Sequence, residues 1–207
     1  MHPNPIYRLP TAEVNIAFAR DRGFGALAVN NDDGPLISHI PFVLSEDGNR
    51  LEAHLVRSNP IVRLLAEPVA AVMAVSGGDA YVSPDWYGME NQVPTWNYVA
   101  VHIRGTLEQR DPAELPVVLA ALSAQSEDRL KPKTPWTMDK VDPELSAKLQ
   151  RQIVPIVMTV SDIQGTWKLA QNKPVEAREG ARAGIAAARL GGDVDALVEI
   201  MGAVKEA

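Results

Sequence analysis

The pattern of apolar and polar residues predicts a chain of short β-strands with helices between and after them. Strand-like runs are predicted over residues 25–30, 36–44, 51–56, 69–75, 80–83, 95–104 and 153–160. Residues 31–34 and 46–49 contain Asp-Gly pairs typical of hairpin turns, and Gly77-Gly78 predicts a further turn. Helical spacing, capping residues and prolines predict helices over residues 11–20, 60–65, 112–129 and 143–151, and two more after residue 174, broken at Gly191-Gly192.

The strand at 95–104 has two different faces. Its core face carries Val99, Val101 and Ile103. Its other face carries aromatic, basic and imidazole side chains, namely Trp96, Tyr98, His102 and Arg104. These residues are too apolar for open water and too polar for a sealed interior, so we expect a second subunit or a flat ligand to cover them.

The strand at 36–44 is apolar on both faces, with Leu36, Ile40 and Phe42 on one and Ile37, Pro41 and Val43 on the other. Such a strand is typical of a closed barrel or of a sheet beneath a partner. The predicted fold class is therefore α+β, mainly β: a six- to eight-stranded, mostly antiparallel barrel with flanking helices. We expect residues 1–173 to form the barrel domain and residues 174–207 a helical hairpin packed on it.

Composition narrows the functional classes. The chain has 207 residues, no cysteine and a formal net charge of -6, which excludes disulfides and thiolate chemistry and disfavours direct contact with DNA. After residue 172 there are five basic and six acidic residues, so the terminal helix pair lacks the basic surface of a DNA-reading motif. The chain has no leader pattern and no apolar run of the ~20 residues that a membrane helix needs, so we expect a cytoplasmic protein.

One segment suggests a phosphate site on its residues alone. Asn59 is a good N-cap and Pro60 suits the first helical position, directly after Arg57 and Ser58. Free amides at a helix start, beside a cation and a hydroxyl, attract phosphate. The alternative is an ordinary capped helix with an arginine in solvent.

Three motifs carry a resemblance to a known family. They read Tyr-Val-Ser-Pro-x-Trp-Tyr at 81–87, Val-Pro-Thr-Trp-Asn-Tyr-x-Ala-Val-His at 93–102 and Trp-Lys-Leu-x-Gln-Asn-Lys at 167–173. Together they resemble the PaiB family of FMN-binding negative transcriptional regulators of sporulation and protease genes. Residues 38–41 and 54–60 are similar to further family segments. The resemblance implies a split β-barrel of the pyridoxamine-phosphate-oxidase and flavin-reductase type, in a homodimer that holds flavin at the subunit boundary. One departure is Ala170, where the family usually has serine and its hydroxyl group.

The resemblance also implies site residues for FMN. Arg57, Ser58 and the amides after Asn59 would hold the phosphate, with Lys168 or Lys173 available from the later motif. The ring and ribityl surroundings would come from Ser38, His39, His54, Thr95, Trp96 and Asn97, and Gln171 belongs to the same set. The alternatives are hydrogen-bonded structural histidines, tryptophans that only anchor the dimer, and a Lys168–Asn172 segment that fixes the dimer or the helix pair.

Other chemistry has weaker support in the sequence. The spacing of His39, His54 and His102 matches no metal-ligand signature, and no nucleophile motif is present, so we predict no metal site and assign no catalytic residue. Because the chain is acidic, we expect any regulatory role to be indirect, through redox or ligand sensing. The alternatives are a flavin-dependent reductase, a haem-binding or haem-degrading protein on the same barrel, or an interaction protein that has lost its cofactor.

Overall fold

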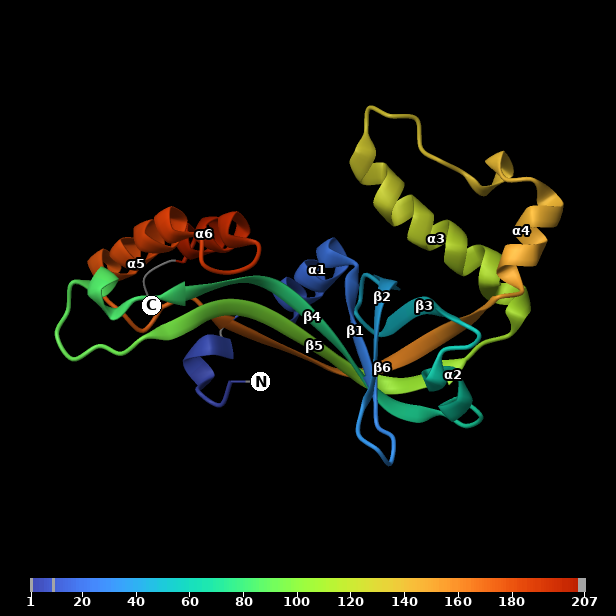
Figure 1. Ribbon diagram of the computed structural model, residues 1–207, viewed down its shortest axis with the longest axis horizontal. Coiled ribbons are helices and arrows are strands. Elements are labelled where there is room, and N and C mark those ends of the chain that lie inside the picture. The colour runs from blue at the N-terminus through green and yellow to red at the C-terminus, as the bar shows by residue number, and fades with distance from the viewer. Residues whose placement is uncertain (1, 9, 205–207) are drawn as a thin grey trace. The chain divides into compact units, whose positions relative to one another are not determined.

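The computed structural model describes residues 2–8 and 10–204 (Figure 1). Its helices are α1 (Ala12–Arg22), α2 (Pro60–Leu64), α3 (Leu115–Glu127), α4 (Pro143–Gln150), α5 (Val175–Ala188) and α6 (Val194–Gly202). Its strands are β1 (Phe24–Val29), β2 (Leu36–Leu44), β3 (Arg50–Val56), β4 (Val69–Val82), β5 (Thr95–Gln109) and β6 (Ile153–Lys168). Short 3-10 turns include η1 (Pro5–Arg8), η2 (Pro84–Tyr87), η3 (Pro112–Glu114), η4 (Asp128–Leu130) and η5 (Met138–Lys140). None of the described helices is long and apolar enough to cross a membrane.

The strands close into a barrel in the order β1-β2-β3-β6-β5-β4. Antiparallel pairing joins β1 to β2 and β4, and β3 to β2 and β6. The register places Phe24 opposite Pro41 and Arg50 opposite Thr159. The predicted antiparallel barrel is therefore confirmed, with six strands.

The backbone contacts divide the chain into two compact units. Unit 1 comprises the described residues of Met1–Asn15, Ser76–His102 and Gln164–Ala207. Unit 2 comprises Ile16–Val75 and Ile103–Ile163. Strands β4, β5 and β6 each contribute residues to both units, whereas α5 and α6 belong to unit 1 and α3 and α4 to unit 2. The sequence-based boundary at residue 173 stays a prediction.

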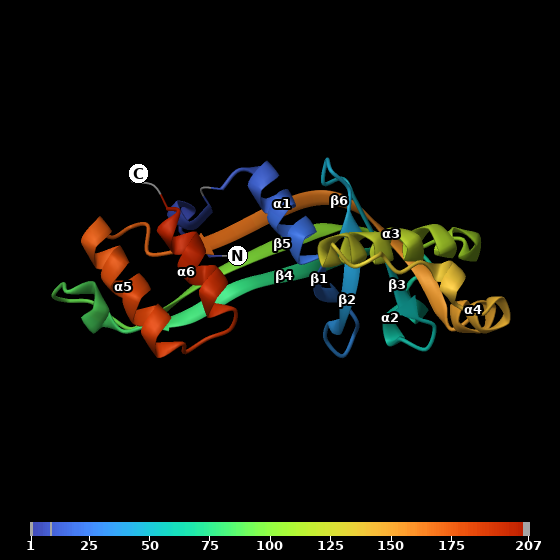
Figure 2. The same ribbon diagram turned by 90° about the horizontal axis from the view of Figure 1, so that it is seen from above.

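In unit 2, alternate strand residues fill the barrel core. Its fully buried large side chains include Leu27, Phe42, Leu44, Leu51, Leu55, Met73, Ile103, Leu107, Ile156 and Met158. Helix α3 lies across β2 and β3 (Figure 2), where the side chain of Gln125 donates to the carbonyl oxygen of Phe42 at 3.1 Å. The second apolar face of β2 stays open at its start, since Ile37 is 60% exposed. The barrel alone therefore does not supply the two-sided cover expected for this strand.

In unit 1, α5 and α6 pack together beside the second half of β4 (Figure 1). The amide of Tyr81 donates to the carbonyl oxygen of Leu190, and the amide of Asp79 to that of Gly192, both at 2.9 Å. The two predicted terminal helices and their break are thus confirmed. The loop between them therefore bonds to β4 much as an edge strand would, which satisfies the carbonyl oxygens of Leu190 and Gly192.

Two sequence-based boundaries were wrong. β4 continues through Gly77-Gly78 without a turn. A Cβ atom at Gly78 would lie 2.6 Å from the carbonyl oxygen of Asp193, so the glycine permits a close approach of α6 rather than a turn. β6 runs to Lys168, eight residues beyond the predicted end at Val160, because its backbone pairing continues where the apolar pattern lapses at Ser161 and Asp162.

Candidate functional site

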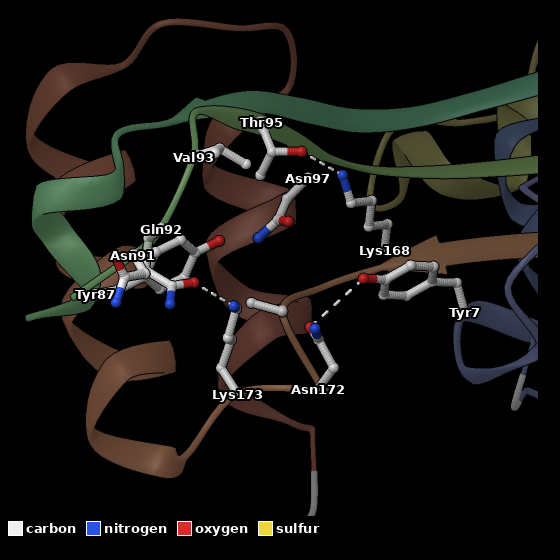
Figure 3. Close-up of a pocket in the computed structure, with 11 residues that line it drawn as sticks. Tyr7, Tyr87, Asn91, Gln92, Val93, Thr95, Asn97, Lys168, Asn172 and Lys173 are labelled. Atoms are coloured by element: carbon white, nitrogen blue, oxygen red, sulfur yellow. Dashed lines mark hydrogen bonds between the residues drawn. The ribbon is translucent and has the colours of Figure 1, made fainter. Parts of the chain in front are cut away.

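A cavity of about 350 Å³ lies within unit 1 (Figure 3). Its size falls within the roughly 300–1,000 Å³ typical of small-molecule sites. It is lined by Tyr7, Tyr87, Asn91, Gln92, Val93, Thr95, Asn97, Lys168, Ala170, Asn172 and Lys173. Segments far apart in the sequence therefore meet here: η1, the loop after η2, the start of β5 and the end of β6. We call this space the unit 1 cavity.

Lys168 reaches the unit 1 cavity from the last position of β6. Its neighbour Trp167 is buried, and the indole nitrogen donates to Oδ1 of Asn15 at 2.9 Å. Because side chains alternate along a strand, this anchoring turns Lys168 to the other side, toward the cavity. There its ammonium group donates to the hydroxyl oxygen of Thr95 and lies 6.0 Å from the ring centroid of Tyr7. Partial burial lowers the pKa of Lys168.

Lys173 reaches the cavity from a tight turn after β6. Ala170 holds a left-handed conformation, with φ of 59°, and its carbonyl oxygen accepts from the amide of Lys173 at 2.9 Å. The side chain of Gln171 donates to the carbonyl oxygens of Trp167 and Ile6, and its own oxygen accepts from the amide of Leu169. Gln171, one of the predicted cofactor residues, thus fixes the turn that carries Lys173.

The ammonium group of Lys173 bonds to the side-chain oxygen of Gln92 and lies 5.2 Å from the ring centroid of Tyr87. Across the cavity, the hydroxyl group of Tyr7 donates to Oδ1 of Asn172 at 3.5 Å. Burial raises the pKa of both tyrosines, so both phenols stay neutral donors at physiological pH.

Asn97 is the most deeply buried polar residue of the cavity, at 1% exposure. Its amide nitrogen makes a weak 3.6 Å contact to the sulfur of Met201. Its Oδ1 atom has no hydrogen-bond partner among the described residues. A buried carbonyl oxygen without a donor is costly, so this atom marks a place where a ligand or water donor would be stabilised.

Strand alternation separates Trp96 from the two residues beside it. Thr95 and Asn97 line the unit 1 cavity, whereas Trp96 points away from it, is 46% exposed and makes an edge contact to the ring of Tyr81 at 6.3 Å. The burial of Val99 confirms the predicted core face of β5. The structure therefore does not bring Trp96 into one site with Thr95 and Asn97.

The other predicted residues lie in unit 2. Ser38 and His39 lie in β2, His54 lies on the outer face of β3, and Arg57, Ser58 and Asn59 lie between β3 and α2. His54 lines a cavity of about 320 Å³ together with Pro41, Leu119, Leu122, Ser123, Ser126, Glu127 and Trp136. The Nδ1 atom of His54 is buried and has no hydrogen-bond partner among the described residues. Burial also lowers the pKa of His54, which keeps the imidazole neutral near pH 7.

β3 ends at Val56, and Arg57 and Ser58 form the turn that follows it, where both are exposed. The guanidinium group of Arg57 donates to the carbonyl oxygens of Arg151 at 2.9 Å and of Ile153 at 3.2 Å, so its position is fixed while its outer edge faces solvent. We call His39, Pro41, His54, Arg57 and Ser58 the β2–β3 site.

Asn59 and Ser38 support this end of unit 2. The side-chain oxygen of Asn59 accepts from the amide of Ile61 at 3.0 Å, and its nitrogen donates to the hydroxyl oxygen of Ser38 at 3.0 Å. The predicted cap and the proline start of α2 are confirmed, but α2 has only five residues and its Ile61 amide is already satisfied by the cap. His39 is exposed on the outer face of β2. Phosphate binding by the amides of this short helix stays a prediction.

Sequence reasoning missed several residues of these sites. Tyr7 joins the unit 1 cavity from the N-terminal segment, and Gln92 joins it from a loop that has no periodicity. Asn15 was assigned to an ordinary helix, although its contact anchors Trp167. Trp136 lines the cavity beside His54 and belongs to no predicted element or motif. The only signal for Gln92 was its place between the two family motifs at 81–87 and 93–102, and for the other three there was none.

Comparisons with known proteins agree on the family and the fold. A family model described as "Putative FMN-binding domain" matches residues 1–162. The chain is 30% identical over 169 residues to "Protease synthase and sporulation protein PAI 2" of Bacillus subtilis (strain 168), a match that covers 81% of this chain and 80% of that protein.

Two solved structures share the fold. The FAD and heme binding protein from Mycobacterium smegmatis matches with a TM-score of 0.57 at 19% identity, over 84% of this chain and 78% of that one. The conserved hypothetical protein Rv2991 from Mycobacterium tuberculosis matches with a TM-score of 0.55 at 15% identity, over 81% and 91%. The predicted split β-barrel class is confirmed. The chain therefore belongs to the PaiB-like family of FMN-binding-domain proteins.

Proposed function

We infer that this protein binds FMN at the β2–β3 site and acts as a PaiB-like regulator through redox or ligand sensing. Family membership supports a flavin ligand, and one observation in unit 2 carries the location: the buried, unpartnered Nδ1 atom of His54 beside a cavity. A flavin ring has a flat apolar surface that suits the apolar lining residues and polar edge atoms that could bond to Nδ1 of His54.

The residues present fit the ring. Pro41, Leu119, Leu122 and Trp136 give the cavity apolar walls, and His54, Ser123, Ser126 and Glu127 give it polar groups. Because the pKa of His54 is lowered by burial, the imidazole contacts the ring without adding a positive charge. When bound, FMN supplies reversible electron and hydride transfer, and the contribution of this chain is to hold and shield the ring.

The residues that follow fit the phosphate. Arg57 lies three residues after His54, in the turn that follows the end of β3 at Val56. Its guanidinium group is held by two carbonyl oxygens, so little side-chain entropy is lost when it meets an anion. The exposed hydroxyl group of Ser58 adds a neutral donor.

We also propose that the chain forms a homodimer through the outer face of β5. Trp96 is 46% exposed on the outer face of β5, and its ring contacts Tyr81, which also contacts Trp86. An aromatic group of this kind is typical of an interface centre. Trp96→Lys is expected to convert the dimer to a monomer in sedimentation experiments, whereas a wild-type chain that sediments as a monomer would contradict the dimer.

Regulation would be indirect. The formal net charge of -6 does not favour binding to a DNA duplex. A change in the redox state of the flavin or in ligand occupancy would therefore have to be transmitted to another molecule. We therefore expect no salt-dependent binding to a DNA duplex at physiological ionic strength. Measurable duplex affinity that falls steeply with salt would contradict this part of the proposal.

The flavin site is tested by titrating FMN into the full chain and following its visible absorbance and fluorescence. Arg57→Ala is expected to weaken FMN binding at least about tenfold, because a charge-assisted contact to phosphate is lost. Arg63→Ala is the matched control, since Arg63 is an exposed arginine in the last turn of α2, and its FMN affinity should be unchanged. Full affinity in Arg57→Ala would remove the site from β3. NADPH oxidation with FMN present would add a reductase activity to the same site.

A further inference from the structure

We propose that the unit 1 cavity is a second ligand site, separate from the flavin site, and that it binds a small oxyanion bearing a hydrogen-bond donor. The inference does not depend on where FMN binds in unit 2. Its basis is the combination of two lysines and one buried, unpartnered amide oxygen in a single cavity (Figure 3).

The positive charge of the residues that line the cavity favours a negatively charged ligand. Lys168 and Lys173 both reach the cavity, and none of the described residues that line it is acidic. Each ammonium group has three donors and makes one hydrogen bond to a neutral side-chain oxygen, Thr95 for Lys168 and Gln92 for Lys173. No carboxylate among these lining residues neutralises the two cations, so an oxyanion would add charge-assisted contacts to donors that the lining leaves free.

Partial burial strengthens the argument for Lys168. Desolvation lowers its pKa, and no attractive charge among the described residues offsets this effect. A bound oxyanion would restore the solvation that burial removes. The neighbouring aromatic rings also stabilise the two positive charges, but only weakly. Lys173 lies 5.2 Å from the ring centroid of Tyr87, and Lys168 lies 6.0 Å from that of Tyr7.

Asn97 adds a requirement for a donor. Its Oδ1 atom is buried within the cavity wall and accepts no hydrogen bond from the described residues. Figure 3 shows the amide pointing into the same space as the two ammonium groups. A hydroxyl or amino group on the ligand would satisfy this oxygen, so a hydroxylated phosphate ester or hydroxy acid fits better than a bare anion. The volume of about 350 Å³ restricts the ligand to a small molecule.

The access to this cavity suggests how occupancy could be sensed. The loop after η2 supplies Asn91, Gln92 and Val93, of which Asn91 holds a left-handed φ of 58° and Val93 is 72% exposed. The bond from Gln92 to Lys173 ties this loop to the turn after β6. An oxyanion that competes for Lys173 would weaken this tie and change the position of an exposed loop.

The test is isothermal titration calorimetry with the full chain and four probes. Glycerol 3-phosphate and inorganic phosphate examine a phosphate group with and without a hydroxyl donor, lactate examines a hydroxy acid, and glycerol is the uncharged control. We expect one of the two hydroxylated anions to bind, and to bind more tightly than inorganic phosphate. Their relative affinity identifies whether a phosphate or a carboxylate is preferred. Binding of glycerol equal to that of every anion, or no binding of any probe, would overturn the proposal.

Variants then locate the site. Lys168→Met and Lys173→Met keep the aliphatic stem, and each should weaken anion binding at least about tenfold. Lys148→Met, at an exposed lysine of α4 in unit 2, is the matched control and should leave the affinity unchanged. Circular dichroism verifies that each variant is folded. Unchanged affinity in both cavity variants would refute the assignment.

The same variants separate this site from the flavin site. FMN affinity should be unchanged in Lys168→Met and Lys173→Met, and anion affinity should be unchanged in Arg57→Ala. If the cavity variants lost FMN and the small anion together, the cavity would be part of the flavin site, and the inference of a second site would fall while flavin binding would stand.

Discussion

The contact between Asn15 and Trp167 is predicted to be a main stabilising interaction of unit 1. Asn15 is 5% exposed and Trp167 is 9% exposed, and the indole nitrogen donates to Oδ1 of Asn15 at 2.9 Å. The amide nitrogen of Asn15 donates in turn to the carbonyl oxygen of Thr11 at 3.1 Å. Asn15→Ala therefore removes a buried acceptor from the indole and a donor from the start of α1.

The magnitude follows from these contacts. Removing the acceptor of a buried donor costs about 1–3 kcal/mol, and losing a second hydrogen bond costs about 0.5–1.5 kcal/mol. Alanine regains about 0.5 kcal/mol through its higher helix propensity. Asn15→Ala should thus lower the free energy of unfolding by about 1–4 kcal/mol. Because Trp167 carries Lys168 at the next position, the variant should also weaken binding of the anionic probe in the unit 1 cavity.

A double-mutant cycle isolates the contact. Urea unfolding followed by far-ultraviolet circular dichroism gives the free energy of unfolding for wild type, Asn15→Ala, Trp167→Phe and the double variant. We expect a coupling energy of about 1–2 kcal/mol, since phenylalanine has no N–H group to lose. The cycle with Trp86→Phe in place of Trp167→Phe is the control and should be additive. A coupling below about 0.5 kcal/mol for the first pair would refute the reasoning.

Three further predictions follow from single residues. Gly184→Ala in α5 would place a Cβ atom 2.3 Å from the indole ring of Trp86. Although alanine has the better helix propensity, this clash should lower the free energy of unfolding, measured in urea, by about 1–2 kcal/mol. A more stable variant would show that the ring moves freely. Ala170→Gly should raise the free energy of unfolding by up to about 1 kcal/mol. The strain energy that glycine relieves at this left-handed position exceeds the cost of the entropy that glycine adds to the unfolded chain. A large loss of stability in the same assay would contradict this prediction. Burial lowers the folded-state pKa of His54 below its ordinary value of about 6.5, so the unfolded state takes up this proton at a higher pH than the folded state. The free energy of unfolding should therefore fall as the pH decreases from about 6.5 through the folded pKa. His54→Gln should flatten this part of the plot of unfolding free energy against pH, and parallel plots for the two proteins would refute the prediction.

The sequence by itself determined most of the secondary structure. Two Asp-Gly pairs defined the hairpins, Asn59-Pro60 defined the start of α2, and the alternation of Val99, Val101 and Ile103 with polar residues defined the core face of β5. These features are local, because a turn, a cap or an alternating strand is set by residues a few positions apart. The family motifs were also readable without a structure, and so was the barrel.

Local signals failed where a residue serves a distant partner. Gly77-Gly78 looked like a turn, but the structure shows a continuous strand in which Gly78 makes room for α6. The end of β6 was placed too early because backbone pairing does not require apolar side chains. In both places the deciding contact lies far away in sequence, and no periodicity reports it.

The tertiary structure alone decided how the candidate residues group. A single motif placed Thr95, Trp96 and Asn97 together, yet strand geometry sends the middle residue to the opposite face. It also assigns Lys168 and Lys173 to a cavity of unit 1, with Tyr7 from the N-terminal segment, and leaves Arg57 in unit 2. Sequence chemistry identifies which side chains can bind an anion, but the path of the backbone decides which of them share one space, because binding depends on distances of a few ångströms.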